Sequence, residues 1–254
     1  MYQNKTVTAI INCAGLSIRF GVNKLTQKIN GEYIILKTIK RFVLPEIDQL
    51  IVTVSQKYWD EYQQILIEDE KLPVELVLGG AERYLSALNG IKATQSDIII
   101  LHDGVRPFVK PELIRNLLAA TVKHQAAMLA IPATTTIKVS DSAQFIKKSL
   151  LRTESWLAQT PQAFTRKVIL SAYEKALAQN YQIVSDDSEV VSNFTRQRVK
   201  IVPGDEANIK LTFQQDLAIA QVIDQNFGKW TIYVKPKTAP GNWDWSSPTS
   251  AYAK

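Results

Sequence analysis

Short apolar runs rich in β-branched residues recur along the sequence, and segments with helical spacing of apolar residues separate them. Such runs are typical of strands that are buried on both faces of a sheet. Strands that alternate with helices form a mostly parallel sheet, because right-handed connections place helices on both of its faces. The sequence therefore predicts an α/β fold with strands in the runs 7–11, 50–54, 74–78, 98–101 and 126–131.

The pattern changes after these runs. Residues 134–140 and 145–146 are β-rich and flank a turn-prone Ser140-Asp141-Ser142, which predicts a projecting β-arm at about 133–153. Because an isolated hairpin is marginally stable in water, we expect the arm to contact a second copy of the chain in a homodimer. The predicted domain spans 1–228, and residues 229–254 predict an irregular C-terminal tail.

The turn after the first run, residues 12–24, combines small residues with a serine and two cations, Arg19 and Lys24. Consecutive backbone N–H groups in such a turn can hold phosphate oxygens, and the cations supply the positive charge that a polyphosphate needs. The glycine spacing matches neither the dinucleotide fingerprint nor the lysine-serine/threonine phosphate loop. The segment is therefore either a nucleoside triphosphate loop or an ordinary strand-to-helix connection with solvated cations.

A glycine pair, Gly79-Gly80, follows the run 74–78 and leads into a segment with helical spacing. Glycine allows close approach of a ligand, so the early N–H groups and the Ser86 hydroxyl could face a base or a ribose. The alternative is a plain turn with a solvated Arg83. Ligands of open α/β sheets sit beyond the carboxyl ends of the strands, so the position of this turn at such an end favours a ligand site.

Asp103 comes just after the apolar run 98–101, where a carboxylate would meet ligand phosphates. One carboxylate together with phosphate oxygens is a usual way to hold Mg²⁺, since the ion keeps several waters. The alternative is that Asp103 caps a helix or a turn. His102 and His124 are the only histidines of the sequence, so a histidine-centred mechanism is not favoured. Zinc-ligand spacing and a serine with an evident histidine partner are also absent from the sequence.

The net charge of +6 and the pI of about 9.2 could indicate a nucleic-acid partner. However, the basic residues are spread along the chain without a nucleic-acid module signature, so we expect small anionic ligands and no nucleic acid. The single cysteine cannot form an internal disulfide. No apolar run approaches the roughly 18 residues of a membrane span, and no export signal is evident. We therefore expect a cytoplasmic protein that does not bind membranes.

Motifs from most of the chain form an ordered set. They are Ala14-Gly15-x-Ser17-x-Arg19, Lys24, Gly79-Gly80-x-x-Arg83-x-x-Ser86, His102-Asp103-x-x-Arg106-Pro107, Ile131-Pro132-x-Thr134-x-Thr136-Ile137-Lys138, Ala158-Gln159-Thr160-Pro161-Gln162-Ala163-Phe164, Asp186-Asp187 and Asn208-Ile209-Lys210-x-Thr212. In this order they resemble the motifs of 2-C-methyl-D-erythritol 4-phosphate cytidylyltransferases, over about residues 7–223. Ribitol-5-phosphate cytidylyltransferases are similar as well.

The resemblance implies a Rossmann-like fold of the nucleotide-diphosphosugar-transferase type. It implies transfer of CMP from CTP to 2-C-methyl-D-erythritol 4-phosphate in isoprenoid-precursor synthesis, with Mg²⁺ on Asp103. Implied contacts to CTP are made by Cys13, Ala14, Gly15, Ser17, Gly80, Ala81, Ser86 and Gly104. The implied catalytic residues around the triphosphate are Arg19, Lys24 and Lys210. The implied contacts to the phosphate of the acceptor, in part across a dimer, are made by Arg106, Thr136, Arg152, Thr160 and Ser185.

The residue types agree with this chemistry. A phosphate monoester, whose second pKa is near 6, is already mostly a dianion at pH 7, so its oxygen needs no general base. Catalysis then depends on positioning and on neutralising the charge of the transferring group and of the leaving pyrophosphate. Arginine and lysine side chains supply that charge.

The chain departs from the family pattern at three points. Ser17 stands where the family usually has glycine, and Lys24 lies closer to Arg19, as in molybdenum-cofactor guanylyltransferases. Thr135 replaces the usual aspartate before Thr136. These differences leave two alternatives open. One is a cytidylyltransferase for ribitol 5-phosphate or another polyol phosphate, and the other is a nucleotide-binding protein without turnover.

Overall fold

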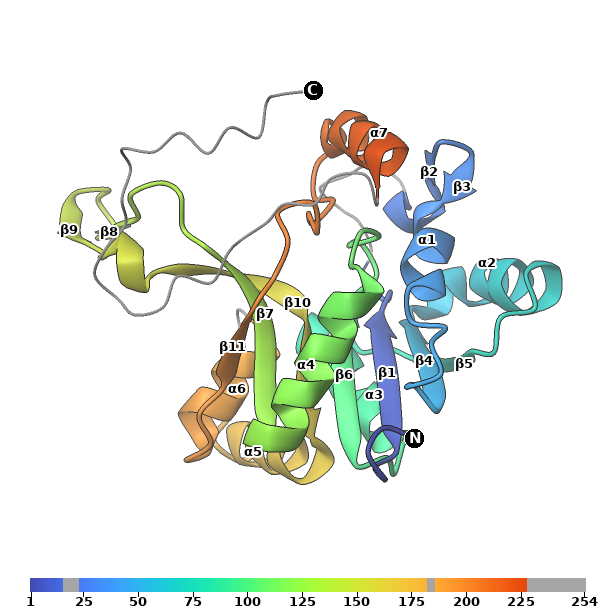
Figure 1. Ribbon diagram of the computed structural model, residues 1–254, viewed down its shortest axis with the longest axis horizontal. Helices are drawn as coiled ribbons and strands as arrows, with labels where there is room; N and C mark the ends of the chain where they lie inside the picture. The colour runs from blue at the N-terminus through green and yellow to red at the C-terminus, as the bar shows by residue number, and fades with distance from the viewer. Residues whose placement is uncertain (16–22, 182–185, 228–254) are drawn as a thin grey trace. The chain divides into compact units, whose positions relative to one another are not determined.

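The structure is a computed structural model that describes residues 1–15, 23–181 and 186–227. Within these residues, a seven-stranded sheet has the strand order β11-β7-β10-β6-β1-β4-β5 (Figure 1). Its strands are β1 (Val7–Asn12), β4 (Gln49–Val54), β5 (Glu75–Leu78), β6 (Ile98–Asp103), β7 (Ala126–Pro132), β10 (Trp156–Thr165) and β11 (Lys200–Pro203). Parallel pairing joins β4 to β1 and β5, β1 to β6, and β7 to β11, whereas β10 runs antiparallel to β6. The predicted α/β fold with a mostly parallel sheet is confirmed.

Helices cover both faces of this sheet. They are α1 (Ile34–Lys40), α2 (Trp59–Gln63), which continues as the π-helical segment η4 (Gln64–Asp69), α3 (Arg83–Lys92), α4 (Pro111–His124), α5 (Arg166–Ala178), α6 (Asp187–Phe194) and α7 (Asp216–Asn226). Short 3₁₀ turns occur at η2 (Lys24–Thr26), η3 (Gln56–Tyr58) and η5 (Arg152–Glu154). In Figure 1, α4 crosses the near face of the sheet.

Alternate residues of the central strands enter two separate cores. In β6, Ile98 and Ile100 belong to one buried cluster, and Ile99 and Leu101 belong to the other. Successive side chains of a strand point to opposite faces, so each face of the sheet has its own core. Helices α1, α2, α4 and α7 contribute to the first cluster, and α3, α5 and α6 contribute to the second. This double burial explains why the strands read as continuous apolar runs.

Residues Pro132–Trp156 form part of a second compact unit. It contains β8 (Lys138–Ser140) and β9 (Ile146–Ser149), which pair antiparallel where the sequence predicts a hairpin. Asp141 shapes the turn, because its Oδ1 accepts hydrogen bonds from the N–H groups of Ala143 and Phe145 at 3.0 and 2.9 Å. A second small hairpin, β2 (Lys28–Ile29) with β3 (Glu32–Tyr33), belongs to the larger unit. The predicted tail, 229–254, lies outside the described residues.

Two elements differ from the sequence prediction. Strand β10 enters the centre of the sheet, between β7 and β6, although its polar stretch Gln159-Thr160-Pro161-Gln162 has no strand pattern. The stretch is polar because it carries buried hydrogen bonds and part of the site. Helix α6 begins at Asp187 in a polar stretch where the sequence analysis places no helix, and Asp186 caps it by accepting the Glu189 N–H at 3.0 Å.

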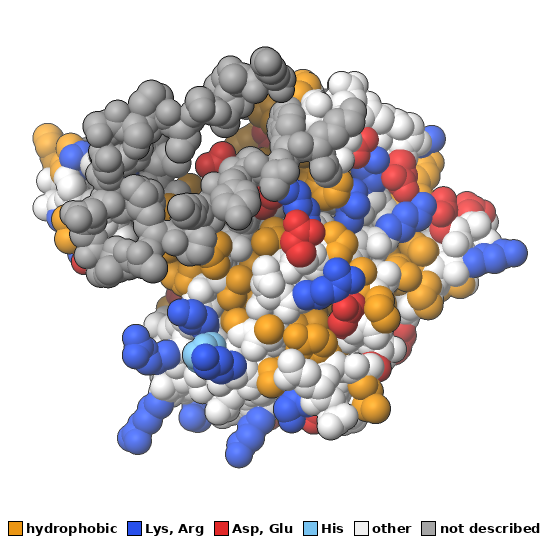
Figure 2. Space-filling model, viewed as in Figure 1, with side chains coloured by type: hydrophobic (Ala, Val, Ile, Leu, Met, Phe, Trp, Pro, Cys, Tyr) orange, Lys and Arg blue, Asp and Glu red, His pale blue; other side chains and the backbone are white. Residues whose placement is uncertain are grey.

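Figure 2 shows the distribution of charge on the visible face of the described residues. Several Lys and Arg side chains gather at the lower left beside a histidine, and others lie among acidic groups toward the upper right. In the described part of the chain, no helix has the length and apolar character needed to cross a membrane.

Candidate active site

A cleft of about 590 Å³ lies at the carboxyl ends of β1, β4, β5 and β6. The segment after β1, the glycine turn after β5 and the end of β6 at Asp103, each of which the sequence analysis singled out, all contribute residues to this cleft. The predicted residues that line this cleft are Cys13, Ala14, Gly15, Lys24, Gly80, Ala81, Ser86, Asp103 and Lys210. The parallel register of β1 with β4 and β6 brings these loops to one edge of the sheet.

The loops after β1 and β5 approach each other closely. A Cβ atom at Gly79 would lie 2.3 Å from the Cβ of Ala14 and 2.8 Å from the Ser86 hydroxyl oxygen, so this position requires glycine. The same hydroxyl accepts a hydrogen bond from the Gly80 N–H at 3.1 Å and lies 3.1 Å from the Glu82 carbonyl oxygen, to which it can donate. Ser86 therefore fixes the turn that forms one wall of the cleft.

Cys13 lies in the floor of the cleft and is almost fully buried. Burial, together with the nearby charge of Asp103, raises the pKa of its thiol well above the ordinary value. The thiol therefore stays protonated and does not act as a nucleophile. A Cβ at Gly104 would lie 2.4 Å from the Cys13 sulfur, so Gly104 packs behind Cys13 and is not among the lining residues. Its predicted contact to the nucleotide stays a prediction.

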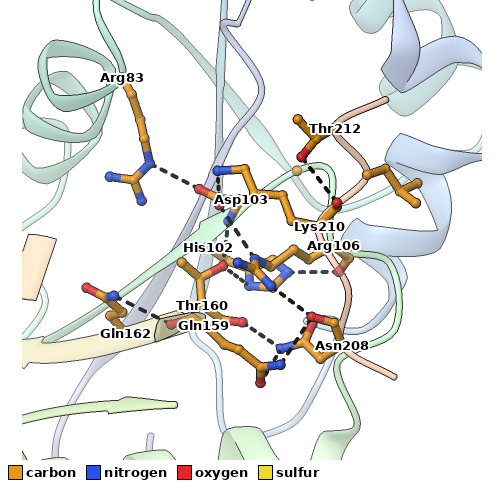
Figure 3. A network of polar contacts seen from close by, with 12 residues as sticks. Arg83, His102, Asp103, Arg106, Gln159, Thr160, Gln162, Asn208, Lys210 and Thr212 are labelled. Atoms are coloured by element: carbon orange, nitrogen blue, oxygen red, sulfur yellow. Dashed lines mark hydrogen bonds and ion pairs between the residues drawn. The ribbon is translucent and has the colours of Figure 1, made fainter. Parts of the chain in front are cut away.

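Asp103 is the acidic centre of the site and is held by three cations (Figure 3). Its Oδ1 lies 3.0 Å from the Arg83 Nε, and its Oδ2 lies 2.9 Å from the Lys210 Nζ and 3.6 Å from the Arg106 Nε. Burial by itself would raise the pKa of Asp103, but the three positive charges lower it well below the ordinary value. Asp103 is therefore ionised at every physiological pH.

Arg83 joins Asp103 to a second buried acid. While its Nε donates to Asp103, its Nη1 and Nη2 donate to the two carboxylate oxygens of Asp187 at 3.2 and 2.9 Å. Burial would lower the pKa of Arg83, but Asp187 and Asp103 raise it well above the ordinary value. The solvated Arg83 that the sequence left open is therefore excluded.

His102 is a structural residue rather than an acid or a base. Its Nδ1 lies 3.0 Å from the Thr160 hydroxyl, and its Nε2 lies 3.0 Å from the Arg106 carbonyl oxygen (Figure 3). Since a carbonyl only accepts, Nε2 carries the proton and Nδ1 accepts from Thr160. Burial lowers the pKa of His102 to about 3, so the ring is neutral at pH 7. The sequence expectation that a histidine does not drive the chemistry agrees with this geometry.

Burial of neutral His102 makes the fold sensitive to acid. Its pKa is lowered on folding, so the unfolded state binds the proton first and stability falls as the pH drops from about 6.5 toward 3. Between pH 7.5 and pH 5.0 the expected loss in free energy of unfolding is about 2 kcal/mol, to be measured by urea unfolding. The His102→Gln variant should lose less over this range, and His124→Gln should lose as much as the wild type. Equal wild-type stability at both pH values would contradict the assignment.

The segment after β11 brings Lys210 to the cleft. Asn208 anchors this segment through two hydrogen bonds. Its side-chain Nδ2 donates to the Thr160 carbonyl oxygen at 2.8 Å, and its main-chain carbonyl oxygen accepts from the Arg106 Nη1 at 2.8 Å. The Nζ of Lys24 donates to the carbonyl oxygen of Leu211 at 3.2 Å. Two lysines far apart in sequence, Lys24 and Lys210, therefore line the same cleft as Asp103.

A smaller cleft of about 240 Å³ shares Arg83, Asp103 and Lys210 with the first. Arg106 and Thr160, which the sequence assigned to the acceptor phosphate, line this second cleft. The hydroxyl of Thr160 accepts the Asp103 N–H at 3.0 Å, so Thr160 also orients the main chain at Asp103. The two clefts thus meet at one carboxylate, one lysine and one arginine.

Five predicted site residues are not tested by the described clefts. Ser17, Arg19 and Ser185 fall outside the described residues. Thr136 and Arg152 belong to the unit that contains the β-arm. Their predicted roles stay predictions.

Some residues of the clefts were given no role by the sequence analysis. Arg83 is the main one, because the motif Gly79-Gly80-x-x-Arg83 contained it but assigned it no ligand contact. Asn12, Ser55 and Gln56 also line the first cleft, and Gln159, Gln162 and Asp186 line the second. The position of Asn12 and Ser55 next to the ends of β1 and β4 could have indicated them.

The sequence and the structure of the chain are similar to those of known proteins. Residues 7–226 match the family model described as 2-C-methyl-D-erythritol 4-phosphate cytidylyltransferase. A protein of that name from Caldanaerobacter subterraneus subsp. tengcongensis is 36% identical over 85% of this chain and 97% of its own length. A second protein of that name, from Geobacter metallireducens, is 35% identical over 85% of this chain and 96% of its own length. The structure of 4-diphosphocytidyl-2C-methyl-D-erythritol synthase from Anaerococcus prevotii has a TM-score of 0.78 at 32% identity, over 87% of this chain and 99% of that one.

Proposed function

The chain belongs to the 2-C-methyl-D-erythritol 4-phosphate cytidylyltransferase family, and we propose that its two clefts bind the two substrates of that reaction. The enzyme transfers the cytidylyl group of CTP to 2-C-methyl-D-erythritol 4-phosphate and releases pyrophosphate, a step of isoprenoid-precursor synthesis. The observation that carries the division of the site is the meeting of both clefts at Asp103 and Lys210. Since the enzyme draws on cellular CTP, we propose a cytoplasmic location.

CTP occupies the larger cleft in this proposal. Ala14 and Gly15 line this cleft and offer their backbone N–H groups to the triphosphate, whereas the Cys13 N–H already donates to the Thr53 carbonyl oxygen at 2.9 Å. Lys24 and Lys210, which line the same cleft, neutralise the charge of the triphosphate. The turn that Ser86 fixes holds the base and ribose. Arg19 and Ser17, which lie outside the described residues, keep the roles toward the phosphates that the family resemblance implies. The close approach of Gly79 to Ala14 supports this division, because it keeps the loops after β1 and β5 together along one cleft.

The acceptor phosphate occupies the smaller cleft, against Arg106 and Thr160. One of its oxygens attacks the α-phosphorus of CTP, and the new P–O bond forms as the bond to the bridging oxygen of the β-phosphate breaks. Pyrophosphate leaves with that electron pair. No proton has to be removed from a dianionic phosphate, and the buried neutral His102 offers no base. The lysines stabilise the charge that spreads over the transferring group.

Magnesium fits the donor set at Asp103. In the described residues no group of three or more His, Cys, Asp or Glu side chains is placed to hold a metal. A single carboxylate is enough for an ion that phosphate oxygens and water otherwise coordinate. Lys210 is 41% exposed, so it can turn from the Asp103 Oδ2 toward a phosphate and free that oxygen for the ion. Bound there, Mg²⁺ would neutralise charge on the phosphates of CTP.

The β-arm supports a homodimer in this proposal. Phe145, Ile146 and Leu151 are 72, 66 and 65% exposed on the arm unit. Large apolar side chains that gather on one exposed hairpin are typical of an interaction surface. A second copy of the chain would cover them and bring Thr136 and Arg152 toward the acceptor, together with Ser185.

The deciding experiment is pyrophosphate release with a panel of acceptors and nucleotides. We expect turnover with CTP and 2-C-methyl-D-erythritol 4-phosphate, and little with GTP. Turnover with ribitol 5-phosphate alone would replace the acceptor named here. Binding of CTP without pyrophosphate release from any polyol phosphate would favour a nucleotide-binding protein that has lost turnover.

A further inference from the structure

Two buried polar residues behind the site have no place in either cleft. Tyr173 lies on α5 and Asp187 is the first residue of α6, and both are fully buried. Neither lines the larger or the smaller cleft. The hydroxyl of Tyr173 donates to the Asp187 Oδ1 at 2.6 Å. Burial and the charge of Asp187 raise the pKa of Tyr173 well above the ordinary value, so the hydroxyl remains a donor at neutral pH.

The guanidinium of Arg83 connects Asp187 to Asp103 by hydrogen bonds to both carboxylates. Its two terminal nitrogens face the two oxygens of Asp187 at 3.2 and 2.9 Å, which is the fork-to-fork geometry of a bidentate pair. Because the guanidinium is planar and rigid, fixing its fork also fixes the direction of its Nε–H. That N–H donates to the Asp103 Oδ1 at 3.0 Å. The Oδ2 of Asp103 is left to Lys210 and Arg106.

The helices around the Arg83–Asp187 ion pair have other contacts that hold them together. Helices α3, α5 and α6 already meet in an apolar core that includes Ala87, Ile91, Ile169 and Val190. Replacing a buried ion pair with apolar residues is often neutral or stabilising, so a buried pair is weak evidence for a role in stability. The contact of Arg83 with Asp103 instead indicates that the Arg83–Asp187 pair serves the site.

We infer that Tyr173 and Asp187 are positioning residues, which hold Arg83 so that it fixes one oxygen of Asp103 and directs the other toward Lys210 and the substrates. The inference rests on the proposed role of Asp103 in the reaction. It extends the site by two residues that do not touch a substrate. The series of hydrogen bonds runs from Tyr173 through Asp187 and Arg83 to Asp103.

The kinetic test is Tyr173→Phe, with Tyr181→Phe as a matched control. Tyr181 also donates to a carboxylate of α6, the Glu189 Oε1 at 2.7 Å, but it is not connected to Arg83. Loss of a hydrogen bond to a charged group predicts a fall in kcat of about tenfold for Tyr173→Phe, with KM for CTP within about twofold of wild type. Tyr181→Phe should keep the wild-type kcat. Wild-type kcat in both variants, or an equal fall in both, would overturn the inference.

The conservative variant Arg83→Lys separates geometry from charge. Lysine keeps the positive charge but cannot face two carboxylates with a planar fork. We expect Arg83→Lys to lose at least as much kcat as Tyr173→Phe. A lysine variant with wild-type kcat would show that charge alone is required and would overturn the inference.

A spectroscopic readout tests the inference without turnover. In ¹⁵N-labelled protein, the Nε–H of Arg83 should give a signal protected from solvent exchange, identified by its loss in Arg83→Lys. Tyr173→Phe should shift this signal or speed its exchange, and Tyr181→Phe should leave it unchanged. An unchanged signal in Tyr173→Phe would overturn the inference. Failure of the wild type to turn over any acceptor would instead reject the proposed function, and the signal would still decide the role of Tyr173.

Discussion

Replacing Lys210 with alanine should lower kcat by about 100- to 1000-fold, the loss typical of removing one group that stabilises charge in a transition state. Lys210 borders both clefts, and its Nζ lies 2.9 Å from the Asp103 Oδ2. Its side chain is 41% exposed, so it can follow the phosphate charge as the α-phosphorus changes partners. The measurement is steady-state pyrophosphate release at saturating CTP and acceptor.

The control for this experiment is Lys92→Ala. Lys92 ends α3, is exposed and lines neither cleft. It should keep the wild-type kcat, which separates local chemistry from a change in overall charge. The fold should tolerate Lys210→Ala, because Arg83 and Arg106 still face Asp103. A kcat within twofold of wild type would remove Lys210 from the mechanism.

The Asp103→Asn variant should lose both stability and turnover. It leaves Arg83, Arg106 and Lys210 facing a neutral amide in a nearly buried position. Removing one partner from a buried ion pair predicts a loss in free energy of unfolding of about 3 to 5 kcal/mol. Loss of the central carboxylate should lower kcat by at least about 100-fold. Urea unfolding at pH 7.5 measures the first effect, and pyrophosphate release well below the unfolding temperature measures the second.

The pH dependence of the free energy of unfolding, compared between the wild type and Asp103→Asn, provides a further check. The pKa of Asp103 is lowered on folding, so its ionised form stabilises the fold above the unfolded pKa near 4, and this stabilisation is lost progressively as the pH falls below it. The difference in stability between wild type and Asp103→Asn should therefore shrink below about pH 4. The exposed Asp60, replaced by asparagine, should change stability by no more than about 0.5 kcal/mol. A difference that stays constant with pH would contradict the assigned ion pairs.

The sequence predicted those features that depend on local pattern. Alternating burial along β6 is a property of neighbouring residues, so the strand and its two cores follow from Ile98-Ile99-Ile100-Leu101. The placement of Lys24 and Asp103 at one cleft follows from the rule that the carboxyl ends of parallel strands share an edge. These inferences need no knowledge of distant contacts.

The remaining features depend on contacts between distant residues. Arg83 and Asp187 are 104 positions apart, and only the fold brings them together. Strand β10 carries Gln159 and Thr160, whose side chains hydrogen-bond within the site, so functional polarity hides its strand pattern. Asp187 likewise reads as part of a polar turn, although it is a fully buried helix residue paired with an arginine.

In the proposed function, CTP binds across the cleft that Lys24, Asp103 and Lys210 line. A crystal structure of the protein with CTP and Mg²⁺ tests it most directly. We expect the triphosphate between Lys24 and Lys210, magnesium on Asp103, and the base against Gly80 and Ser86. A nucleotide bound elsewhere, or a triphosphate that touches neither lysine, would contradict it.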